Sequence, residues 1–341
     1  MTTPTLDIII PVWNSPAETR GCLVSVMESA QTARLIIINN GCDRTTELML
    51  EEICDHLGER ALYLTMERNI GFVPAVNRAL KRSEADWCII LRPTTIINPH
   101  CIQQLLQTTT LEQAGLVTPR CLPEIPLPTQ LLKSNCTTLE TCEISFVAIA
   151  ISKVMRETIG LFDEELDGGP WCLKDYRYRA DAHGFRTYLA ATVTVEGQPA
   201  ALLGSLERRR RLVETARTIC QQRWGTQEHL AIYLPKETDE EKLNETLKLL
   251  LSAARHGHLF ELFLHGRQYH AACKSGATCL HCGITLHKLP ALFTIRRLAR
   301  TMTALTTTYP QLQTVCGLDD TPFPGFDSTL PHTKLFQLAK L

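Results

Sequence analysis

The 341-residue sequence lacks the features that mark several large classes of protein. Neither sign of charge is in excess, because 35 Lys and Arg residues stand against 36 Asp and Glu residues and leave a formal net charge of −1. This balance offers no electrostatic reason to expect nucleic acid as a partner. No run of eighteen apolar residues occurs, so no transmembrane helix is expected. The opening residues, MTTPTLDIII, lack the basic segment and the long apolar core of a secretory signal peptide.

A chain without a secretory signal is expected in the reducing cytoplasm. Its fourteen cysteines are therefore predicted to be free thiols, most of them small core residues, and not a disulfide framework. A Gly- and Lys-rich phosphate loop near the N-terminus is also missing, which disfavours a nucleotidyltransferase-like protein. The apolar content of 44% is that of a globular protein, and the length favours two domains.

The most informative stretch covers residues 67–99. A polar turn leads into a predicted helix of about eleven residues, and an apolar run, Trp87–Leu91, then breaks at the polar residues 92–95. This pattern is half of a βαβ unit with a loop at the carboxyl end of a buried strand. In open α/β sheets ligands bind outside such strand ends, so the chemistry is expected at residues 92–95.

Two further strands are predicted at residues 6–10 and 35–38, joined by a helix at residues 17–30. Strands connected in this way form a parallel pair with a right-handed crossover. A small polar turn follows each strand, at residues 13–15 and 39–41. Both turns should lie at the same sheet edge as residues 92–95. The predicted fold class is therefore α/β, with a Rossmann-type sheet flanked by helices.

Over roughly residues 5–225 the chain resembles the family 2 glycosyltransferases. The motifs that carry the resemblance occur in the family's order: PVWN (11–14), INNGCDRT (38–45), the 67–99 stretch, GLFDEEL (160–166) and DYRYRADAHGFR (175–186). The resemblance implies a GT-A fold with a mixed sheet. It also implies transfer of a hexosyl or deoxyhexosyl group from a UDP-, GDP- or dTDP-type donor to a glycan, lipid-linked or protein acceptor. Because Trp224-Gly225 resembles the end of that catalytic domain, the predicted domains are 1–225 and 226–341.

The resemblance also assigns the residues that would bind the nucleotide. They are Pro11, Val12, Trp13, Asn14, Asn39, Asn40, Gly41, Asn69, Gly71, Asn77, Arg92 and Thr94. Asn39 stands where the family usually has an aspartate that contacts the base, and an amide can still donate and accept there. The residues by themselves allow two other interpretations: 39–41 is a simple turn, and Asn69 caps the next helix.

The chain departs from the family at the metal-binding motif. Pro93 and Thr94 occupy the places of the aspartate pair, and neither supplies the anionic oxygen that Mg²⁺ or Mn²⁺ prefers. Neither cation is therefore expected as a cofactor. We predict that Arg92 neutralises the diphosphate in place of the metal, through bidentate contacts. The alternative is that Arg92 extends along the sheet edge with its charged head in water. Glu196 replaces a histidine that helps to bind metal in many family members.

The general base is the second departure. Where the family has an ED-x-D run, an ungapped count puts Cys172 and Leu173 at the first two acids and Asp175 at the last. If this chain lacks two residues relative to the family's run, Lys174-Asp175 replaces the Glu-Asp pair. Either way Asp175 is the candidate base that takes a proton from the acceptor. Its alternative role is to cap a helix over residues 176–182. Two functions follow: a transferase that works without a divalent metal, or a catalytically inactive binding or assembly module.

Residues 226–341 carry no motif that assigns them to a family, and they are predicted to form a smaller α/β accessory domain. Strands at residues 230–234 and 259–264 flank a helix at 239–255, a second helix covers 290–307, and the tail from Thr321 is irregular. This domain would pack on the first or mediate homo-oligomerisation. A second prediction places a tetrahedral zinc site here, against the alternative of buried thiols; its ligands would be Cys273, Cys279, Cys282 and His287. The expected location is the cytoplasm, either free or peripheral to the inner face of the membrane.

Overall fold

The computed structural model describes residues 4–125, 136–167, 169–197 and 205–339. The chain divides into two compact units. The first contains Met1–Pro126 and Glu143–Gly225, and the second contains Leu127–Cys142 and Thr226–Leu341. The described residues 136–142 therefore belong to the second unit, although the sequence-based division counts them with residues 1–225.

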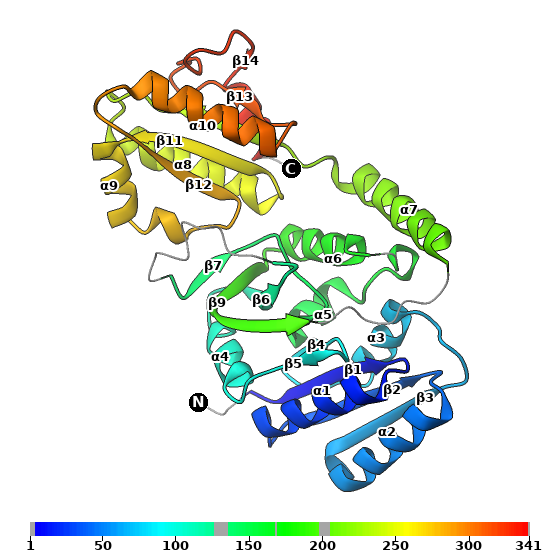
Figure 1. The fold of residues 1–341 in the computed structure, drawn as a ribbon. Helices are drawn as coiled ribbons and strands as arrows, with labels where there is room; N and C mark the ends of the chain where they lie inside the picture. The colour runs from blue at the N-terminus through cyan, green and yellow to red at the C-terminus, as the bar shows by residue number, and fades with distance from the viewer. Residues whose placement is uncertain (1–3, 126–135, 168, 198–204, 340–341) are drawn as a thin grey trace. The chain divides into compact units, whose positions relative to one another are not determined.

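A mixed sheet forms the centre of the first unit, with the strand order β3-β2-β1-β4-β8-β6-β9-β5 (Figure 1). Its strands are β1 (Leu6–Val12), β2 (Arg34–Asn40), β3 (Ala61–Met66), β4 (Trp87–Leu91), β5 (Thr95–Ile96), β6 (Ala114–Leu122), β8 (Ala148–Ser152) and β9 (Arg186–Gly197). From β3 to β4 the strands are parallel, whereas β8 runs antiparallel to both β4 and β6. The predicted GT-A-like mixed sheet is confirmed.

The helices of the first unit surround the sheet, with one exception. They are α1 (Pro16–Ser29), α2 (Arg44–Leu57), α3 (Phe72–Leu80), α4 (Cys101–Thr108), α5 (Lys153–Ile159), α6 (Trp171–Ala182) and α7 (Leu206–Trp224). The exception is α7, which packs against α6 and not against the strands. All five residues of β4 are buried, as expected for an apolar strand packed on both sides. At the start of α2, Asp43 accepts a hydrogen bond from the Thr46 amide at 2.8 Å, which satisfies one free N–H of the first turn.

The structure corrects several sequence-based boundaries. The N-cap of α3 is Gly71 and not Asn69, so the interpretation of Asn69 as the helix cap is wrong. Helix α6 begins at Trp171, which places Asp175 inside the helix and excludes it as a cap.

The second unit contains a parallel sheet with the strand order β12-β11-β10-β13-β14 (Figure 1). Its strands are β10 (His229–Tyr233), β11 (Leu259–His265), β12 (Ile284–Leu289), β13 (Gln313–Val315) and β14 (Thr329–Leu330); its helices are α8 (Glu240–Arg255), α9 (Gly266–Lys274), α10 (Thr294–Thr308) and α11 (Thr333–Leu338). The expected α/β pattern is present. The tail from Thr321, predicted to be irregular, contributes β14 and α11.

A short strand from an earlier part of the chain, β7 (Thr138–Glu140), is bound to this second unit. The Glu140 carboxylate accepts two hydrogen bonds from the guanidinium of Arg255, each 2.6 Å long. The Glu140 backbone also pairs with Leu280 and Cys282. This bidentate ion pair explains why the described residues 136–142 are not part of the first unit.

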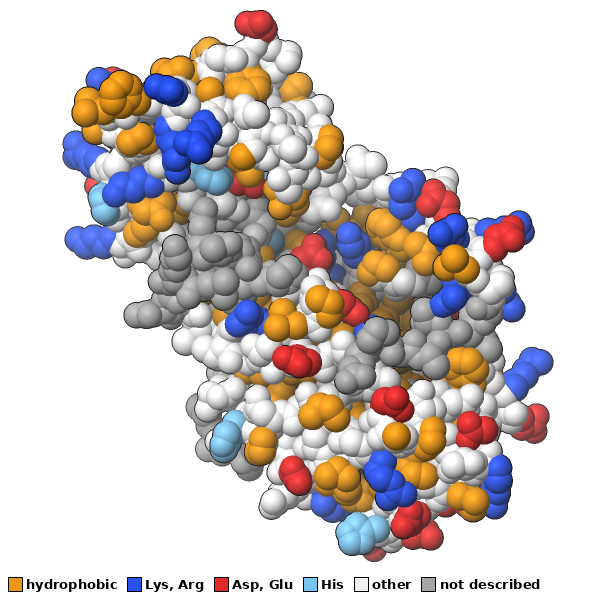
Figure 2. Space-filling view, viewed as in Figure 1, with side chains coloured by type: hydrophobic (Ala, Val, Ile, Leu, Met, Phe, Trp, Pro, Cys, Tyr) orange, Lys and Arg blue, Asp and Glu red, His pale blue; other side chains and the backbone are white. Residues whose placement is uncertain are grey.

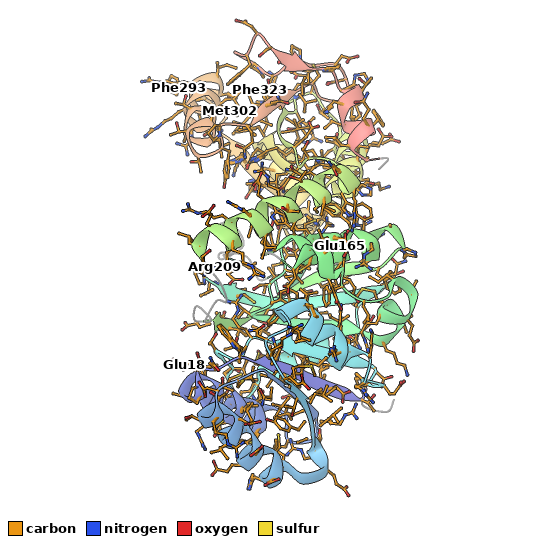
Figure 3. The ribbon with its side chains drawn as sticks, turned by 90° about the vertical axis from the view of Figure 1, so that its right-hand side faces the viewer. Glu18, Glu165, Arg209, Phe293, Met302 and Phe323 are labelled. Carbon is orange, nitrogen blue, oxygen red and sulfur yellow. The ribbon has the colours of Figure 1, made fainter. Side chains whose placement is uncertain are left out.

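Two buried clusters stabilise the second sheet. The smaller one joins Phe263 of β11 and Phe323 to Leu298 and Met302 of α10. Figure 3 labels Met302 and Phe323 in this region, together with Phe293 at the end of α10. The buried cysteines are free thiols, as expected for core residues; they are Cys22, Cys88, Cys101, Cys121, Cys172 and Cys220. In the described parts of the chain, every helix is too short or too polar to span a lipid bilayer.

Candidate functional site

The turns that follow β1, β2 and β4 lie at one edge of the first sheet. Val12 is paired with Asn39 across β1 and β2, and Ile9 is paired with Ile90 across β1 and β4. Because these strands are parallel and adjacent, their carboxyl ends point the same way. The structure therefore brings the 13–15, 39–41 and 92–95 turns to a common edge.

Cys42, which the sequence analysis did not single out, links the first two turns. Its thiol accepts a hydrogen bond from the Asn14 amide at 3.3 Å, and its own amide donates to Asn39 Oδ1 at 2.9 Å. Burial raises the pKa of this thiol, more than the hydrogen bonds from the Asn14 and Asn40 amides lower it. Cys42 is therefore a neutral link between the turns and not a nucleophile.

The β1–α1 turn has an unusual backbone. Asn14 and Ser15 are both left-handed, with φ of 56° and 58°. The Asn14 side chain fixes this turn, since its Oδ1 accepts the Asp43 amide at 2.8 Å at the start of α2. Left-handed residues other than glycine cost free energy and gather at binding and catalytic sites. This turn is therefore a rigid part of the edge.

An amide network joins the β2–α2 turn to the β3–α3 turn. Asn40 Nδ2 donates to Asn69 Oδ1 at 3.2 Å and to the Gly71 carbonyl at 3.1 Å, while Asn40 Oδ1 accepts the Ile70 amide at 3.1 Å. The backbones approach closely, because a Cβ at Gly41 would lie 2.3 Å from the Arg68 carbonyl carbon. Asn40 and Asn69 thus hold the loops together, and glycine is required at position 41.

The two remaining predicted asparagines are buried. Asn39 Nδ2 donates to the Tyr63 hydroxyl at 3.1 Å. Asn77 both donates to the Phe162 carbonyl at 2.9 Å and accepts the Phe162 amide at 3.1 Å, and its Nδ2 also reaches Glu164 at 3.0 Å. Asn77 therefore joins α3 to the 160–166 motif. In this structure Asn77 is a packing residue, which differs from its predicted role in binding the nucleotide.

Arg92 has a partner that the sequence did not reveal. Its Nη1 lies 2.9 Å from Glu124 Oε1, and the same carboxylate accepts a hydrogen bond from the Ser145 hydroxyl. The nearby Thr94 is buried. Glu124 follows β6 and belongs to none of the sequence motifs. Its proximity to Arg92 could therefore not be predicted from the sequence. The guanidinium is therefore oriented by a carboxylate and is not an unpaired group in water.

Asp175 lies in a closed environment. Its side chain is 1% exposed, and its oxygens accept from Arg179 Nε at 2.9 Å, Trp224 Nε1 at 2.9 Å and Arg223 Nη1 at 3.3 Å. These donors tie α6 to the C-terminal end of α7. A general base must reach the acceptor hydroxyl, and this carboxylate is engaged on both oxygens. The geometry therefore supports a structural role for Asp175.

Asp167 is an acid near the site that the motifs do not identify. Its Oδ2 would lie 2.3 Å from a Cβ at Gly71, and it accepts hydrogen bonds from the amides of Phe72 and Val73 at the start of α3. Burial raises the pKa of Asp167, although these amide hydrogen bonds act in the opposite direction. A half-buried carboxylate with a raised pKa beside a predicted nucleotide turn is a candidate proton acceptor.

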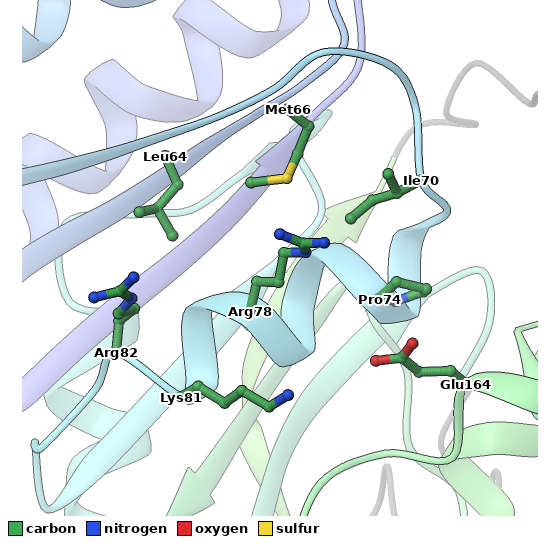
Figure 4. Close-up of a pocket in the computed structure, with 8 residues that line it drawn as sticks. All are labelled: Leu64, Met66, Ile70, Pro74, Arg78, Lys81, Arg82 and Glu164. Atoms are coloured by element: carbon green, nitrogen blue, oxygen red, sulfur yellow. The ribbon is translucent and has the colours of Figure 1, made fainter.

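Two hollows open near these turns. The first, of about 570 Å³, lies along β3 and α3 (Figure 4). Its lining is cationic and apolar and consists of Leu64, Met66, Ile70, Pro74, Arg78, Lys81, Arg82 and Glu164. The second, of about 560 Å³, lies between the first turns of α1 and α2, next to the Asn14–Asp43 contact; it is lined by Pro16, Ala17, Arg20, Thr45, Leu48, Met49 and Glu52.

The predicted zinc site in the second unit is wrong. Among the described residues, no three His, Cys, Asp or Glu side chains are arranged to hold a metal ion, and Cys273, Cys279, Cys282 and His287 are all described. His287 lies on β12 with its Nε2 2.5 Å from Glu261 Oε2, and His229 contacts the other oxygen of Glu261 at 3.0 Å. The strand pairing of β10, β11 and β12 directs His287 to Glu261.

Comparison with known proteins finds a family match in the first part of the chain. Residues 7–129 match the sequence model of glycosyl transferase family 2. The resemblance to family 2 glycosyltransferases is therefore confirmed for that region. A search of curated proteins finds no match to the sequence.

Several solved structures are similar in fold. The mannosyltransferase PcManGT from Pyrobaculum calidifontis, in complex with GDP-Man and Mn²⁺, is 13% identical with a TM-score of 0.52, over 91% of this chain and 82% of that one. GalNAc-T7 with UDP, GalNAc and Mn²⁺ is 12% identical with a TM-score of 0.55, over 92% of this chain and 60% of that one. S. aureus TarS is 14% identical with a TM-score of 0.48, and the match covers 57% of this chain and 37% of TarS. At these identities, the first two neighbours support the GT-A fold alone.

Proposed function

We propose that this protein is a glycosyltransferase that moves a sugar from a nucleotide-sugar donor to an acceptor at the carboxyl edge of β1, β2 and β4. One observation carries the proposal: the polar turns after these three strands meet at one edge of a sheet whose residues 7–129 match glycosyl transferase family 2. The two neighbours with higher TM-scores contain nucleotide or nucleotide-sugar ligands, GDP-Man in one and UDP in the other. The donor proposed for this chain is therefore a UDP-, GDP- or dTDP-sugar.

In this proposal Arg92 takes the place of the divalent cation. The transferred sugar leaves a nucleoside diphosphate, and negative charge builds on the oxygen of the breaking bond. Arg92 follows β4 directly and is already oriented by Glu124 at 2.9 Å. A guanidinium can bind two phosphate oxygens at once, which a Pro93-Thr94 pair cannot do. The proposed reaction accordingly does not require Mg²⁺ or Mn²⁺.

Asp167 is the proposed general base, in preference to Asp175. The acceptor oxygen forms a bond to the anomeric carbon, its proton passes to the Asp167 carboxylate, and the bond from that carbon to the diphosphate oxygen breaks. Asp167 lies beside Gly71, a predicted nucleotide-binding residue, and burial raises the pKa of its carboxyl, which favours proton uptake. Asp175 is closed off by Arg179, Arg223 and Trp224.

The binding step is tested by thermal shift of the full chain with UDP, GDP, CDP and dTDP, each with and without Mn²⁺. A ligand that binds only the folded state stabilises it, by about 2.7 kcal/mol at a hundredfold excess over Kd. We expect one nucleotide to raise Tm without Mn²⁺ and the shift to disappear in Arg92→Ala. Arg217→Ala is the matched control, because Arg217 pairs with Glu214 on α7 away from these turns. A shift that requires Mn²⁺ would contradict the role of Arg92.

The catalytic step is tested by turnover of the stabilising nucleotide's sugar donors. We expect Asp167→Asn to lose turnover while it keeps the nucleotide-induced Tm shift. Asp175→Asn should lower Tm but retain turnover per folded molecule. Loss of turnover in Asp175→Asn, with turnover retained in Asp167→Asn, would identify Asp175 as the general base.

The second candidate function is a catalytically inactive binding or assembly module. Two observations favour it: Asp175 is buried, and the guanidinium of Arg92 already forms an ion pair with Glu124. In this case no nucleotide in the panel shifts Tm, and no donor is consumed. That outcome would reject the transferase.

A further inference from the structure

The connection between β12 and α10 presents large apolar side chains to solvent. Leu292 is 74% exposed, Phe293 78% and Ile295 57%. Phe293 adopts a left-handed conformation with φ of 57°, which is uncommon for a bulky residue. Figure 3 shows Phe293 at the end of α10, while Met302 farther along the same helix belongs to the core. Large apolar residues that are exposed side by side indicate an interaction site.

Three arginines follow these apolar residues on the solvent side of α10. Arg296, Arg297 and Arg300 are exposed, and the spacings of three and four residues place them on one face of the helix. The buried residues Leu298 and Met302 occupy the other face. Within the described part of the chain, none of the three arginines is paired with an acidic side chain. Their charges are therefore available to a partner.

The surrounding sequence is also free of acids. Residues 262–318 contain no Asp or Glu, although they include Arg267, Lys274 and Lys288 in addition to the three arginines. The chain as a whole is nearly neutral, so this is a local separation of charge. In the upper left of Figure 2, blue side chains lie beside orange ones over this part of the second unit. Exposed apolar side chains lie next to arginines that have no acidic neighbours in the sequence. This combination indicates an anionic partner that also accepts apolar groups.

We propose that Leu292, Phe293, Ile295, Arg296, Arg297 and Arg300, here called the α10 tip, bind the surface of a lipid bilayer that contains anionic lipids. The apolar side chains would enter the boundary between headgroups and acyl chains, and the guanidiniums would contact lipid phosphates. A bilayer fits better than an acidic protein. The apolar part is a protruding tip of three side chains, whereas a stable protein interface buries about 800 Å² per partner around a central apolar cluster.

The proposal does not depend on the glycosyltransferase activity, and its test uses the full chain and vesicles alone. Co-sedimentation is measured with vesicles of phosphatidylcholine and with vesicles that contain phosphatidylglycerol in addition. We expect binding to the anionic vesicles only, and we expect it to weaken as salt is raised, because surface charges are screened. Equal binding to both vesicle types, or no binding to either, would overturn the proposal.

Variants separate the two parts of the α10 tip. Replacing the three arginines by glutamine should weaken binding roughly a hundredfold, since each contributes roughly a factor of five near an anionic surface. The control removes the same charge from exposed lysines of the same unit, with Lys236, Lys242 and Lys248 changed to glutamine. Leu292→Ser with Phe293→Ser should also weaken binding, whereas Val154→Ser, at a position 65% exposed on α5, should not.

Equal losses in the control variants would contradict a role for the α10 tip. Capture of a polyglutamate peptide by the unmodified chain, without vesicle binding, would replace the bilayer by an acidic protein partner. If a variant does not fold, as judged by its Tm, the lipid and salt dependence of the unmodified chain still decides the proposal.

Discussion

Arg92 and Glu124 form an ion pair of 2.9 Å at the carboxyl end of β4, although 31 residues separate them in the sequence. Glu124 orients the guanidinium and at the same time competes with any phosphate for it. We therefore expect Glu124→Gln to raise the affinity for the nucleoside diphosphate, roughly fivefold, since partly exposed ion pairs contribute at most about 1 kcal/mol. Isothermal titration calorimetry measures the change in Kd.

The control for this prediction is Glu84→Gln, which removes an exposed partner of Lys153 on another part of the same unit. It should leave Kd unchanged. A weaker affinity in Glu124→Gln would show that orientation by Glu124 is more important than its competition with phosphate.

Gly41 is predicted to be irreplaceable for the stability of the first unit. Its φ is 73°, and an added Cβ would lie 2.3 Å from the Arg68 carbonyl carbon and 2.4 Å from the Asn69 nitrogen. Gly41→Ala should lower the free energy of unfolding by about 2–4 kcal/mol, because both the conformation and the contact are unfavourable. Urea unfolding followed by circular dichroism provides the measurement.

Gly58→Ala is the matched control for this substitution. Gly58 also has a positive φ, of 55°, but no atom lies within 4 Å of an added Cβ. Its cost should be about 1 kcal/mol, from the backbone conformation alone. Equal costs for the two variants would mean that the close approach of the two loops is not rigid.

Asp175 is predicted to contribute to stability. Asp175→Asn leaves the guanidiniums of Arg179 and Arg223 without a buried carboxylate, and it should cost about 3 kcal/mol of unfolding free energy. Glu214→Gln, an exposed member of an ion pair on α7, should change stability by less than about 0.5 kcal/mol. Thermal and urea unfolding of both variants give the comparison. If Asp175→Asn left the free energy of unfolding unchanged, the structural role assigned to Asp175 would be wrong.

The stability of the second unit should depend on the ionisation of Glu261. Burial by itself would raise its pKa, but the hydrogen bonds from His229 and His287 outweigh this effect and hold the pKa below its ordinary value of 4.5. A carboxyl whose pKa is lowered in the folded state stabilises the fold above its unfolded pKa, and that contribution is lost as the pH falls through the folded pKa. We expect unfolding free energy to decrease with falling pH below about 4.5.

Glu261→Gln provides the test of this pH dependence. The variant should be less stable than the unmodified chain at neutral pH, and the difference should shrink below pH 4.5 as the unmodified carboxyl becomes protonated. Unfolding is followed through a probe in the second unit, such as a fluorophore on Cys316. A constant difference at all pH values would mean that the charge on Glu261 does not contribute.

Local patterns in the sequence predict several of the strands and helices of both units. The apolar run that forms β4 is observed at its predicted residues, Trp87–Leu91, because a strand covered on both faces requires a continuous apolar segment. The common edge of the 13–15, 39–41 and 92–95 turns also follows from sequence, since helices connect the strands and make them parallel. The order of motifs was enough to recognise the family over the region that matches it.

The contacts of individual side chains were decided by the tertiary structure. Glu124 approaches Arg92, Asp167 approaches Gly71, and His287 binds Glu261, and in each case the partners are brought together by sheet pairing or by the packing of distant loops. Asp175 was selected as a base from its position in a motif, but its burial depends on where α7 returns to α6. Periodicity reports which face of an element is apolar, whereas the chemistry of a polar group depends on neighbours that only the folded chain assembles.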